Sequence, residues 1–122
     1  MIDHIGVLVS NYSASKRFYE RALGPLGYGL VMEVGAAAGF GAGGKPSFWI
    51  AESGGNAPTA THIAFASTDR ATVDAFFEAA LAAGGRDNGA PGLRPHYHPH
   101  YYGAFVLDPD GHNIEAVCHH PE

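Results

Sequence analysis

Two of the eight histidines in this chain occupy matching positions of an internal repeat, and histidine is the side chain most often used to bind metal ions. When the sequence is aligned with itself at an offset of 58 residues, residues 3–7 fall on residues 61–65, and His4 falls on His62. Within residues 3–23, six positions are identical at this offset. Each histidine belongs to a segment whose apolar residues alternate as in a half-buried β-strand. We therefore expect both imidazoles on one concave face, opposite the apolar side chains of their strands.

A third potential ligand lies in the last apolar segment, residues 113–118, which Glu115 interrupts. Burying a carboxylate there is costly unless it is paired or binds a metal ion. His4, His62 and Glu115 would form a two-histidine, one-carboxylate set, which leaves metal positions open for substrate or water. Taken singly, each of the three is more often a solvated or hydrogen-bonded polar residue. The pairing of the two histidines by the repeat, together with a carboxylate in the last strand, favours the metal interpretation.

Residues 94–102 are rich in histidine, tyrosine and proline, which favours a pocket wall or a lid. His100 and Tyr101 are candidates for a catalytic acid or base, and Arg94 could hold a substrate carboxylate. An adventitious surface metal site and a packed aromatic edge are the alternatives for this segment. Further candidates, for an apolar or stacking surface that binds substrate, are Phe48, Trp49 and Tyr102.

The hydrophobic pattern predicts the same elements in each half of the repeat. Asn11 or Ser13 caps the first helix, which stops at Gly24 and Pro25, and Asp69 caps the second. Predicted strands cover residues 2–9, 30–34, 39–42 and 47–51, and then 61–65, 101–107 and 112–118. Residues 91–100 are too irregular for a regular element and indicate a functional loop. The order βαβββ therefore occurs twice, unless the repeat is a chance likeness of two amphipathic units.

This order predicts an α+β fold with one domain over residues 1–122. Module 1 would span about residues 1–53 and module 2 about residues 60–119. Each module can bury one sheet face against its own helix, while the other face needs a partner. We expect the two modules to form a curved, cup-like mixed sheet with the helices outside.

Composition narrows the possible partners and location. The net charge is −5, and the chain has no cluster of basic residues, so binding to nucleic acid or to an anionic membrane is not expected. No apolar run approaches the roughly 20 residues needed to span a bilayer, and no secretory signal is recognisable. A single cysteine, Cys118, excludes an internal disulfide framework. These features predict a cytoplasmic protein.

Two motifs resemble those of the vicinal oxygen chelate superfamily. The first is residues 3–11 followed by Phe18, Tyr19, Leu23 and Gly24, and the second is residues 105–115, similar to a closing motif written F-x-D-P-D-G-N-x-I-E. The superfamily includes glyoxalases, extradiol dioxygenases, fosfomycin-inactivating thiol transferases and bleomycin-resistance proteins. The resemblance covers nearly the whole chain and implies a fold of two βαβββ modules, as the repeat predicts.

Carried over from that family, the metal ligands would be His4, His62 and Glu115. A fourth ligand position corresponds to Trp49, which cannot ligate. This departs from the glyoxalase I pattern, so lactoylglutathione formation is not expected. The resemblance implies one divalent ion, with Mn, Fe(II), Ni, Zn and Mg all open. Glu115 itself, or His100 or Tyr101 from the His/Tyr-rich segment, is the candidate that would move protons.

Two kinds of function remain open. The first is a metal-dependent enzyme that chelates adjacent oxygens of a small-molecule substrate, as a lyase, isomerase, dioxygenase or transferase. The second is a metal-free protein that binds a drug or metabolite, as in the bleomycin-resistance branch, and a catalytically silent domain is also possible. The resemblance further implies a homodimer, in which ligands come from one chain or from two.

Overall fold

The computed structural model describes residues 2–54 and 59–122 and confirms an α+β fold of two βαβββ modules. The first module contains β1 (Ile5–Val9), α1 (Tyr12–Leu23), the short 3-10 helix η1 (Gly24–Leu26), β2 (Gly29–Val34), β3 (Ala37–Ala42) and β4 (Lys45–Glu52). The second contains β5 (His62–Ala66), α2 (Arg70–Ala82), β6 (Arg86–Leu93), β7 (Tyr102–Leu107) and β8 (Asn113–Cys118).

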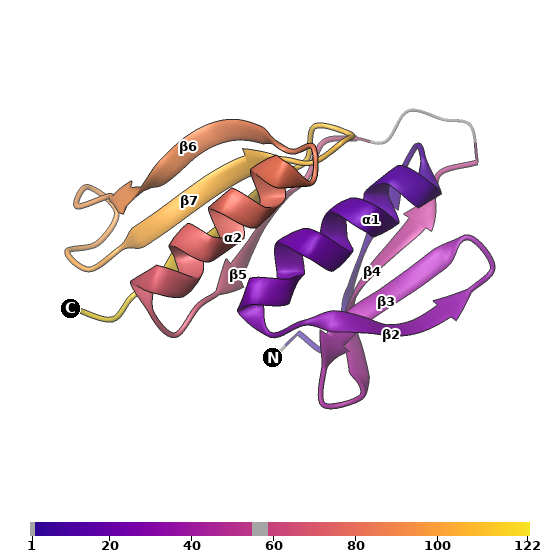
Figure 1. The fold of residues 1–122 in the computed structure, drawn as a ribbon, viewed down its shortest axis with the longest axis horizontal. Coiled ribbons are helices and arrows are strands. Elements are labelled where there is room, and N and C mark those ends of the chain that lie inside the picture. The colour runs from indigo at the N-terminus through magenta and orange to yellow at the C-terminus, as the bar shows by residue number, and fades with distance from the viewer. Residues whose placement is uncertain (1, 55–58) are drawn as a thin grey trace.

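Each module forms its own four-stranded sheet, in the orders β1-β4-β3-β2 and β5-β8-β7-β6 (Figure 1). The first strand of each module runs parallel to the fourth, and the remaining pairs are antiparallel. Gly6 lies opposite Trp49 in the first sheet, and Ala64 lies opposite Glu115 in the second. Trp49 is therefore the register equivalent of Glu115.

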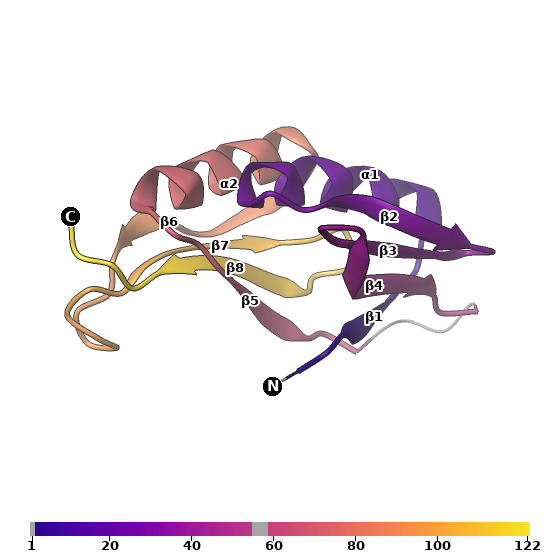
Figure 2. The same ribbon diagram turned by 90° about the horizontal axis from the view of Figure 1, so that it is seen from below.

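Both helices cover the same side of the sheets and pack against each other, as Figure 2 shows. Their inner faces carry residues that the repeat keeps identical, and these are fully buried, for example Phe18 with Phe76 and Ala22 with Ala80. Hydrophobic contact with the helix thus fixes one face of each sheet. The opposite, open face carries every second strand residue, including His62, Trp49 and Glu115.

The two sheets stay separate and open, so they do not form the single curved cup that the sequence predicts. An inter-module clamp of side-chain hydrogen bonds joins them instead. Asp110 Oδ2 accepts from Ser10 N at 3.1 Å, and His112 Nε2 donates to Leu8 O at 2.9 Å. The ring's Nδ1 accepts from Thr61 N at 3.0 Å. The clamp therefore links the end of β1 to the entrance of β5.

Two differences from the predicted strands bear on the candidate site and its surroundings. β1 begins at Ile5, so His4 lies just before the strand rather than within it. β6 covers Arg86–Leu93, where the sequence predicts no strand and an irregular loop from Pro91. Its pairing with β7 shifts register around Gly89, and an edge strand tolerates such bulges and a proline.

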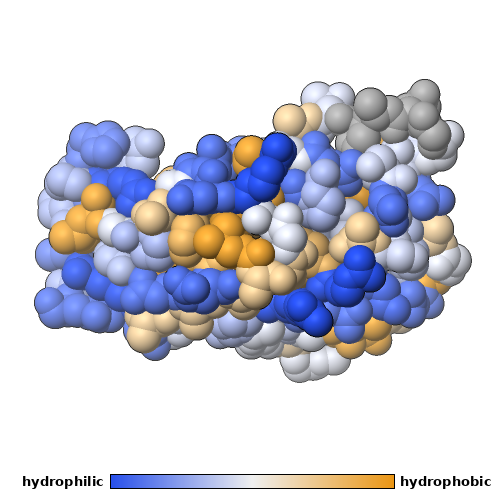
Figure 3. Space-filling model, turned by 45° about the horizontal axis from the view of Figure 1, so that its top comes forward, coloured by the Kyte–Doolittle hydropathy of each residue, from blue (hydrophilic) through white to orange (hydrophobic). Residues whose placement is uncertain are grey.

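On the face that Figure 3 shows, hydrophobic patches alternate with hydrophilic ones. Within the described parts of the chain, neither helix has the length and apolar character needed to cross a membrane.

Candidate functional site

Glu115 is a buried carboxylate on the open face of the second sheet, with 1% of its surface exposed. Its Oε1 lies 3.2 Å from His62 Nε2 on the neighbouring strand β5. Its Oε2 accepts a hydrogen bond from the Tyr101 hydroxyl, which comes from the residue preceding β7. Burial and this bond to Glu115 raise the pKa of Tyr101 above its ordinary value. The sequence-predicted residues His62, Glu115 and Tyr101 thus form one connected chain.

Gly103 makes this arrangement possible because it lies beneath both partners. A Cβ atom on Gly103 would lie 3.1 Å from Tyr101 Cε1 and 3.2 Å from Glu115 Oε2. Phe105 is the neighbour of Glu115 on β7, and its ring stacks with the His62 ring at 6.2 Å and 22°. Sequence reasoning did not identify Gly103 or Phe105 as site residues, although Phe105 begins the second motif and Gly103 lies two residues before it.

The His62 ring is oriented by a backbone carbonyl. Its Nδ1 lies 3.1 Å from Asn113 O, and because a carbonyl oxygen can only accept, Nδ1 carries a hydrogen. In the neutral ring, Nε2 then has a lone pair that faces the carboxylate oxygen Oε1. Two lone pairs at 3.2 Å repel unless a cation, either a proton or a metal ion, lies between them. The pair is therefore built to share a cation.

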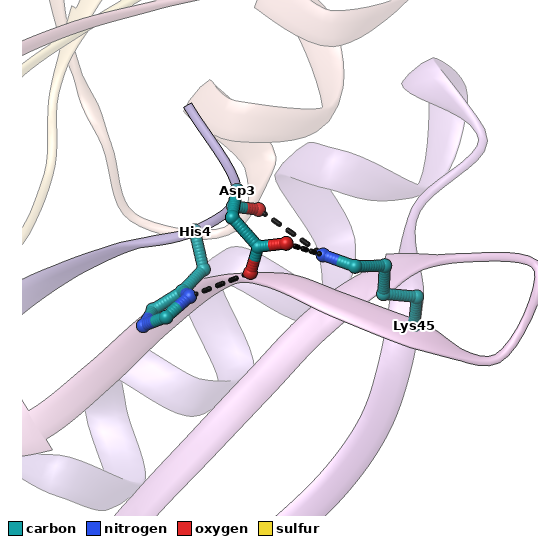
Figure 4. Close-up of polar contacts among 3 residues, drawn as sticks. All are labelled: Asp3, His4 and Lys45. Atoms are coloured by element: carbon teal, nitrogen blue, oxygen red, sulfur yellow. Dashed lines mark hydrogen bonds and ion pairs between the residues drawn. The ribbon is translucent and has the colours of Figure 1, made fainter. Parts of the chain in front are cut away.

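His4 has the same arrangement on the other module. Its Nδ1 donates to Asp3 Oδ1 at 2.8 Å, and Lys45 Nζ binds Asp3 Oδ2 at 2.9 Å (Figure 4). The hydrogen bonds from His4 and Lys45 hold the pKa of Asp3 below its ordinary value. A carboxylate on Nδ1 that leaves Nε2 outward is the typical second shell of a metal-binding histidine. Sequence reasoning missed Asp3, although it directly precedes His4.

The donor set fits a divalent metal ion. Two ligands at about 2.1 Å from one ion, at 90–100° to each other, have their atoms about 3.0–3.2 Å apart. The separation of 3.2 Å between His62 Nε2 and Glu115 Oε1 agrees with this. His4 is not part of a group with them, since among residues 2–54 and 59–122 these three do not come within 4.8 Å of one another. The ligand role of His4 stays a prediction.

A different group, Asp108, Asp110 and His112, does bring three potential ligand atoms within 4.8 Å. Its hydrogen bonds give it a structural role. The Asp108 carboxylate accepts from Tyr19 Oη at 2.6 Å and from the backbone of Asp110 and His112. Both ring nitrogens of His112 are used by the inter-module clamp, and its Nε2 carries the hydrogen. The imidazole therefore offers no lone pair to an ion in this state.

Arg94 holds the β6–β7 connection together. Its Nη1 donates to Gly92 O at 2.7 Å and to Gly103 O at 3.1 Å, and its Nη2 donates to Ala90 O at 2.9 Å. The guanidinium also lies 5.4 Å from the centre of the Phe105 ring. These contacts use three of its five N–H groups, so most of its binding capacity supports the fold rather than a substrate carboxylate.

Three other predicted site residues lie away from Glu115. Tyr102 points to the helix side of β7 and donates to Asp74 Oδ1 at 2.6 Å, a bond that raises its pKa to about 12. It alternates with Tyr101, which explains why adjacent tyrosines lie on opposite faces. His100 is exposed, and its backbone N–H donates to His98 Nδ1 at 3.1 Å. Phe48 is a core residue, packed 4.9 Å from Tyr19.

Trp49 lies on the open face of the first sheet and covers Gly39, where a Cβ atom would come within 2.9 Å of its ring. Trp49 does not line the cavity of about 320 Å³ that lies between the modules. Its walls are mainly apolar and include Ile2, Ile5, Phe48, Phe65 and Tyr28, with His62 and Ser47 as polar members. Because His62 also contacts Glu115, the cavity adjoins the candidate cation site.

Comparisons with known proteins point to one family. The model of the Glyoxalase/Bleomycin resistance protein/Dioxygenase superfamily matches residues 1–116. A crystal structure of a glyoxalase/bleomycin resistance protein from Albidiferax ferrireducens T118 is 30% identical, with a TM-score of 0.84 and 98% of each chain covered. No significant match exists among curated proteins.

More distant structures share the fold. A glyoxalase/bleomycin resistance protein/dioxygenase family enzyme from Burkholderia phytofirmans PsJN is 17% identical, with a TM-score of 0.75 and 98% of each chain covered. A lactoylglutathione lyase from Agrobacterium tumefaciens is 16% identical, with a TM-score of 0.71, and the match covers 97% of this chain and 92% of that one.

Proposed function

The chain belongs to the glyoxalase/bleomycin resistance protein/dioxygenase superfamily, and on this premise we propose that it is a divalent-metal-dependent enzyme acting on adjacent oxygen atoms of a small molecule. One observation carries the proposal. A carboxylate with 1% exposure faces an imidazole whose Nδ1 hydrogen is already committed to a carbonyl. This pair needs a cation, and its 3.2 Å separation suits a shared metal ion.

A divalent ion held by His62 and Glu115 would act as a Lewis acid toward the two oxygens of the substrate. Neighbouring residues of the chain orient these two ligands and supply a proton. Asn113 O fixes the His62 ring, and Tyr101 fixes the carboxylate by donating to Oε2. Because the Tyr101 hydroxyl donates to the same carboxylate that would hold the ion, we propose that this group gives a proton to a substrate oxygen or takes one back.

The cavity next to His62 favours an apolar body for the substrate. Its walls contain no charged residue other than the titratable His62, and an ionic group would be poorly solvated there. The volume of about 320 Å³ is at the lower end of small-molecule sites. We therefore expect a compact, uncharged substrate with two neighbouring oxygens at one end.

We further propose that the third ligand, His4, comes from a second copy of the chain in a homodimer. His4 is 62% exposed at its side chain and does not reach the His62–Glu115 pair within one chain. The open face of the first sheet also leaves Leu8, Met32 and Val34 between 46% and 61% exposed, which suits burial against another subunit.

The metal content of tag-free protein tests the enzyme proposal. After incubation with Mn, Fe(II), Ni or Zn and removal of free metal, Glu115→Gln and His62→Ala should each contain one ion fewer per chain than the wild type by elemental analysis. His120→Ala, which changes an exposed histidine elsewhere, is the control. Equal metal content in wild type and Glu115→Gln would instead support the alternative, a metal-free protein that binds a drug or metabolite in the apolar cavity.

A further inference from the structure

On the surface of the second module, the ring of His98 lies near the rings of two other histidines, one from its own segment and one from a distant segment. His98 and His100 belong to the connection between β6 and β7, and His119 follows β8. The ring centre of His98 lies 5.8 Å from that of His100 and 5.5 Å from that of His119. All three side chains are exposed, and none takes part in the chain of His62, Glu115 and Tyr101.

These separations are close to those of imidazoles bound to one ion. A ligating nitrogen lies about 2.1 Å from the ion and the ring centre about 1.1 Å beyond it, so two rings in tetrahedral coordination have centres about 5.2 Å apart. The observed distances exceed this by a few tenths of an ångström. The rings are also steeply inclined to each other, at 62° and 79°, rather than stacked. The ligand nitrogens of the three residues do not all lie within 4.8 Å of one another among the described residues, so rotation of these exposed side chains is needed to complete the set.

The backbone that carries the cluster is already ordered. Arg94 N donates to Tyr101 O at 2.7 Å, and Tyr101 N donates to His98 O at 3.1 Å, which closes the connection on itself. The Arg94 side chain fixes its base. Metal binding would therefore restrict a few side-chain torsions only, and little conformational entropy would be lost. His98 Nδ1 would give up its bond from His100 N, an exposed donor that water can satisfy.

We propose that His98, His100 and His119 form a second metal-binding site that takes a borderline divalent ion such as Zn²⁺, Ni²⁺ or Cu²⁺, the ions that imidazole ligands suit. The site has a connection to the first one. The Tyr101 ring lies 5.1 Å from the His119 ring, and its hydroxyl binds Glu115. An ion on the cluster would thus hold the segment that presents Tyr101 to Glu115.

Zinc titration of tag-free protein tests this site separately from the first. The experiment uses full-length Glu115→Gln protein, in which the buried site is impaired, and isothermal titration calorimetry with Zn²⁺ alone. We expect one ion to bind per chain. Adding His98→Ala or His119→Ala should weaken this binding by about tenfold or more, since even loss of an outer-shell partner costs about that much. His120→Ala should leave it unchanged.

Histidine ring NMR signals provide the second readout. In the Glu115→Gln protein, Zn²⁺ should shift the ring signals of His98, His100 and His119, while His96 and His120 stay in place. The proposal is overturned if His98→Ala and His119→Ala bind Zn²⁺ as tightly as His120→Ala, or if the zinc-dependent shifts fall on other rings. Failure of the buried site would appear differently, as equal metal content in wild type and Glu115→Gln.

Discussion

The hydrogen-bond partner of Nδ1 distinguishes three histidines by their ability to bind a metal ion, which the sequence alone does not indicate. His4 and His62 each give the Nδ1 hydrogen to an oxygen, so Nε2 keeps a lone pair. His112 accepts a backbone hydrogen at Nδ1, so Nε2 carries the hydrogen and donates it to Leu8 O. The first arrangement is that of a metal ligand, and the second is that of a structural cross-link.

Tyr101→Phe tests whether the tyrosine positions the carboxylate. Without the hydroxyl, Oε2 of Glu115 loses its partner in a nearly dry environment, and the carboxylate is held by His62 alone. We expect metal affinity at this site to fall by about 10- to 100-fold, as for other outer-shell partners. Competition with a chromogenic chelator would measure it. A Tyr102→Phe variant is the matched control, because Tyr102 contacts Asp74 on the other face; equal losses in both variants would contradict the role.

His112→Ala tests the structural assignment of the Asp108, Asp110 and His112 group. The change leaves Leu8 O and Thr61 N without their partners and opens a space in the interior, since His112 is 1% exposed. We expect the free energy of unfolding to fall by about 2–4 kcal/mol, while metal content at a temperature where the variant is folded stays at the wild-type level. Urea unfolding and elemental analysis would measure the two effects. Loss of an ion without loss of stability would make the group a metal site.

Both α-helices begin with a side-chain cap of the same geometry, but the cap of α2 is ionisable and that of α1 is not. Asn11 Oδ1 accepts from Ala14 N at 3.0 Å, and Asp69 Oδ1 accepts from Thr72 N at 2.7 Å, at the repeat offset. Hydrogen bonds from the Thr72 side chain and backbone lower the pKa of Asp69. The stability that the ionised cap adds is therefore fully present above about pH 4, the unfolded-state value, and is lost as the pH falls through the lower folded-state pKa.

Asp69→Asn should accordingly lower the melting temperature at pH 7, and the difference from wild type should vanish on acidification through that window. Asn11→Ala, which removes the uncharged cap, should cost about 1 kcal/mol at both ends of the pH range. Thermal unfolding followed by circular dichroism measures both variants. A constant difference between wild type and Asp69→Asn from pH 7 to pH 2 would show that ionisation of the cap is irrelevant.

The sequence predicted those elements whose side chains alternate between a core and an open face. The caps, both helices and the strands around the two motifs follow from hydrophobic periodicity and from the repeat. β6 could not be predicted, because its sequence, with Gly89, Pro91 and Gly92, lacks strand-forming residues. Its pairing is imposed by β7 and by the Arg94 hydrogen bonds to Gly92 O and Gly103 O, which are tertiary contacts.

Part of the candidate site could be predicted for the same reason. Strand alternation places His62 and Glu115 on one face, and the structure brings them together. The faces of Tyr101 and Tyr102 depend on where β7 begins, and a strand boundary is not fixed by periodicity. The position of His4 relative to His62 and Glu115 depends on how the two modules pack. The hydrophobic pattern of a single strand does not determine that packing.

The two modules present unequal halves of a metal site. The second module holds His62 and Glu115 within 3.2 Å, whereas the first has Trp49 at the position of Glu115 and only His4 as a ligand candidate. The inter-module clamp links the two separate sheets, and among residues 2–54 and 59–122 His4 forms no three-ligand group with His62 and Glu115. Our proposal is that a second chain completes a site that needs both halves.

Mixing two inactive variants tests this arrangement. His4→Ala lacks one half of the site, and Glu115→Gln lacks the other. If His4 of one subunit completes the His62–Glu115 pair of its partner, a mixed dimer contains one intact site and one doubly defective site. Random reassortment would then restore about a quarter of the wild-type sites, because half of the twofold-symmetric dimers are mixed.

The metal content of the mixture is measured after the two variants are refolded together. Both variants also carry His98→Ala, so that the surface cluster does not contribute. No recovery in the mixture, with metal retained by neither variant alone, would mean that the ligands meet within one chain or that His4 is not shared. Recovery that requires both variants would assign His4 and Glu115 to different subunits, because no exchange of side chains inside a single chain can repair either substitution.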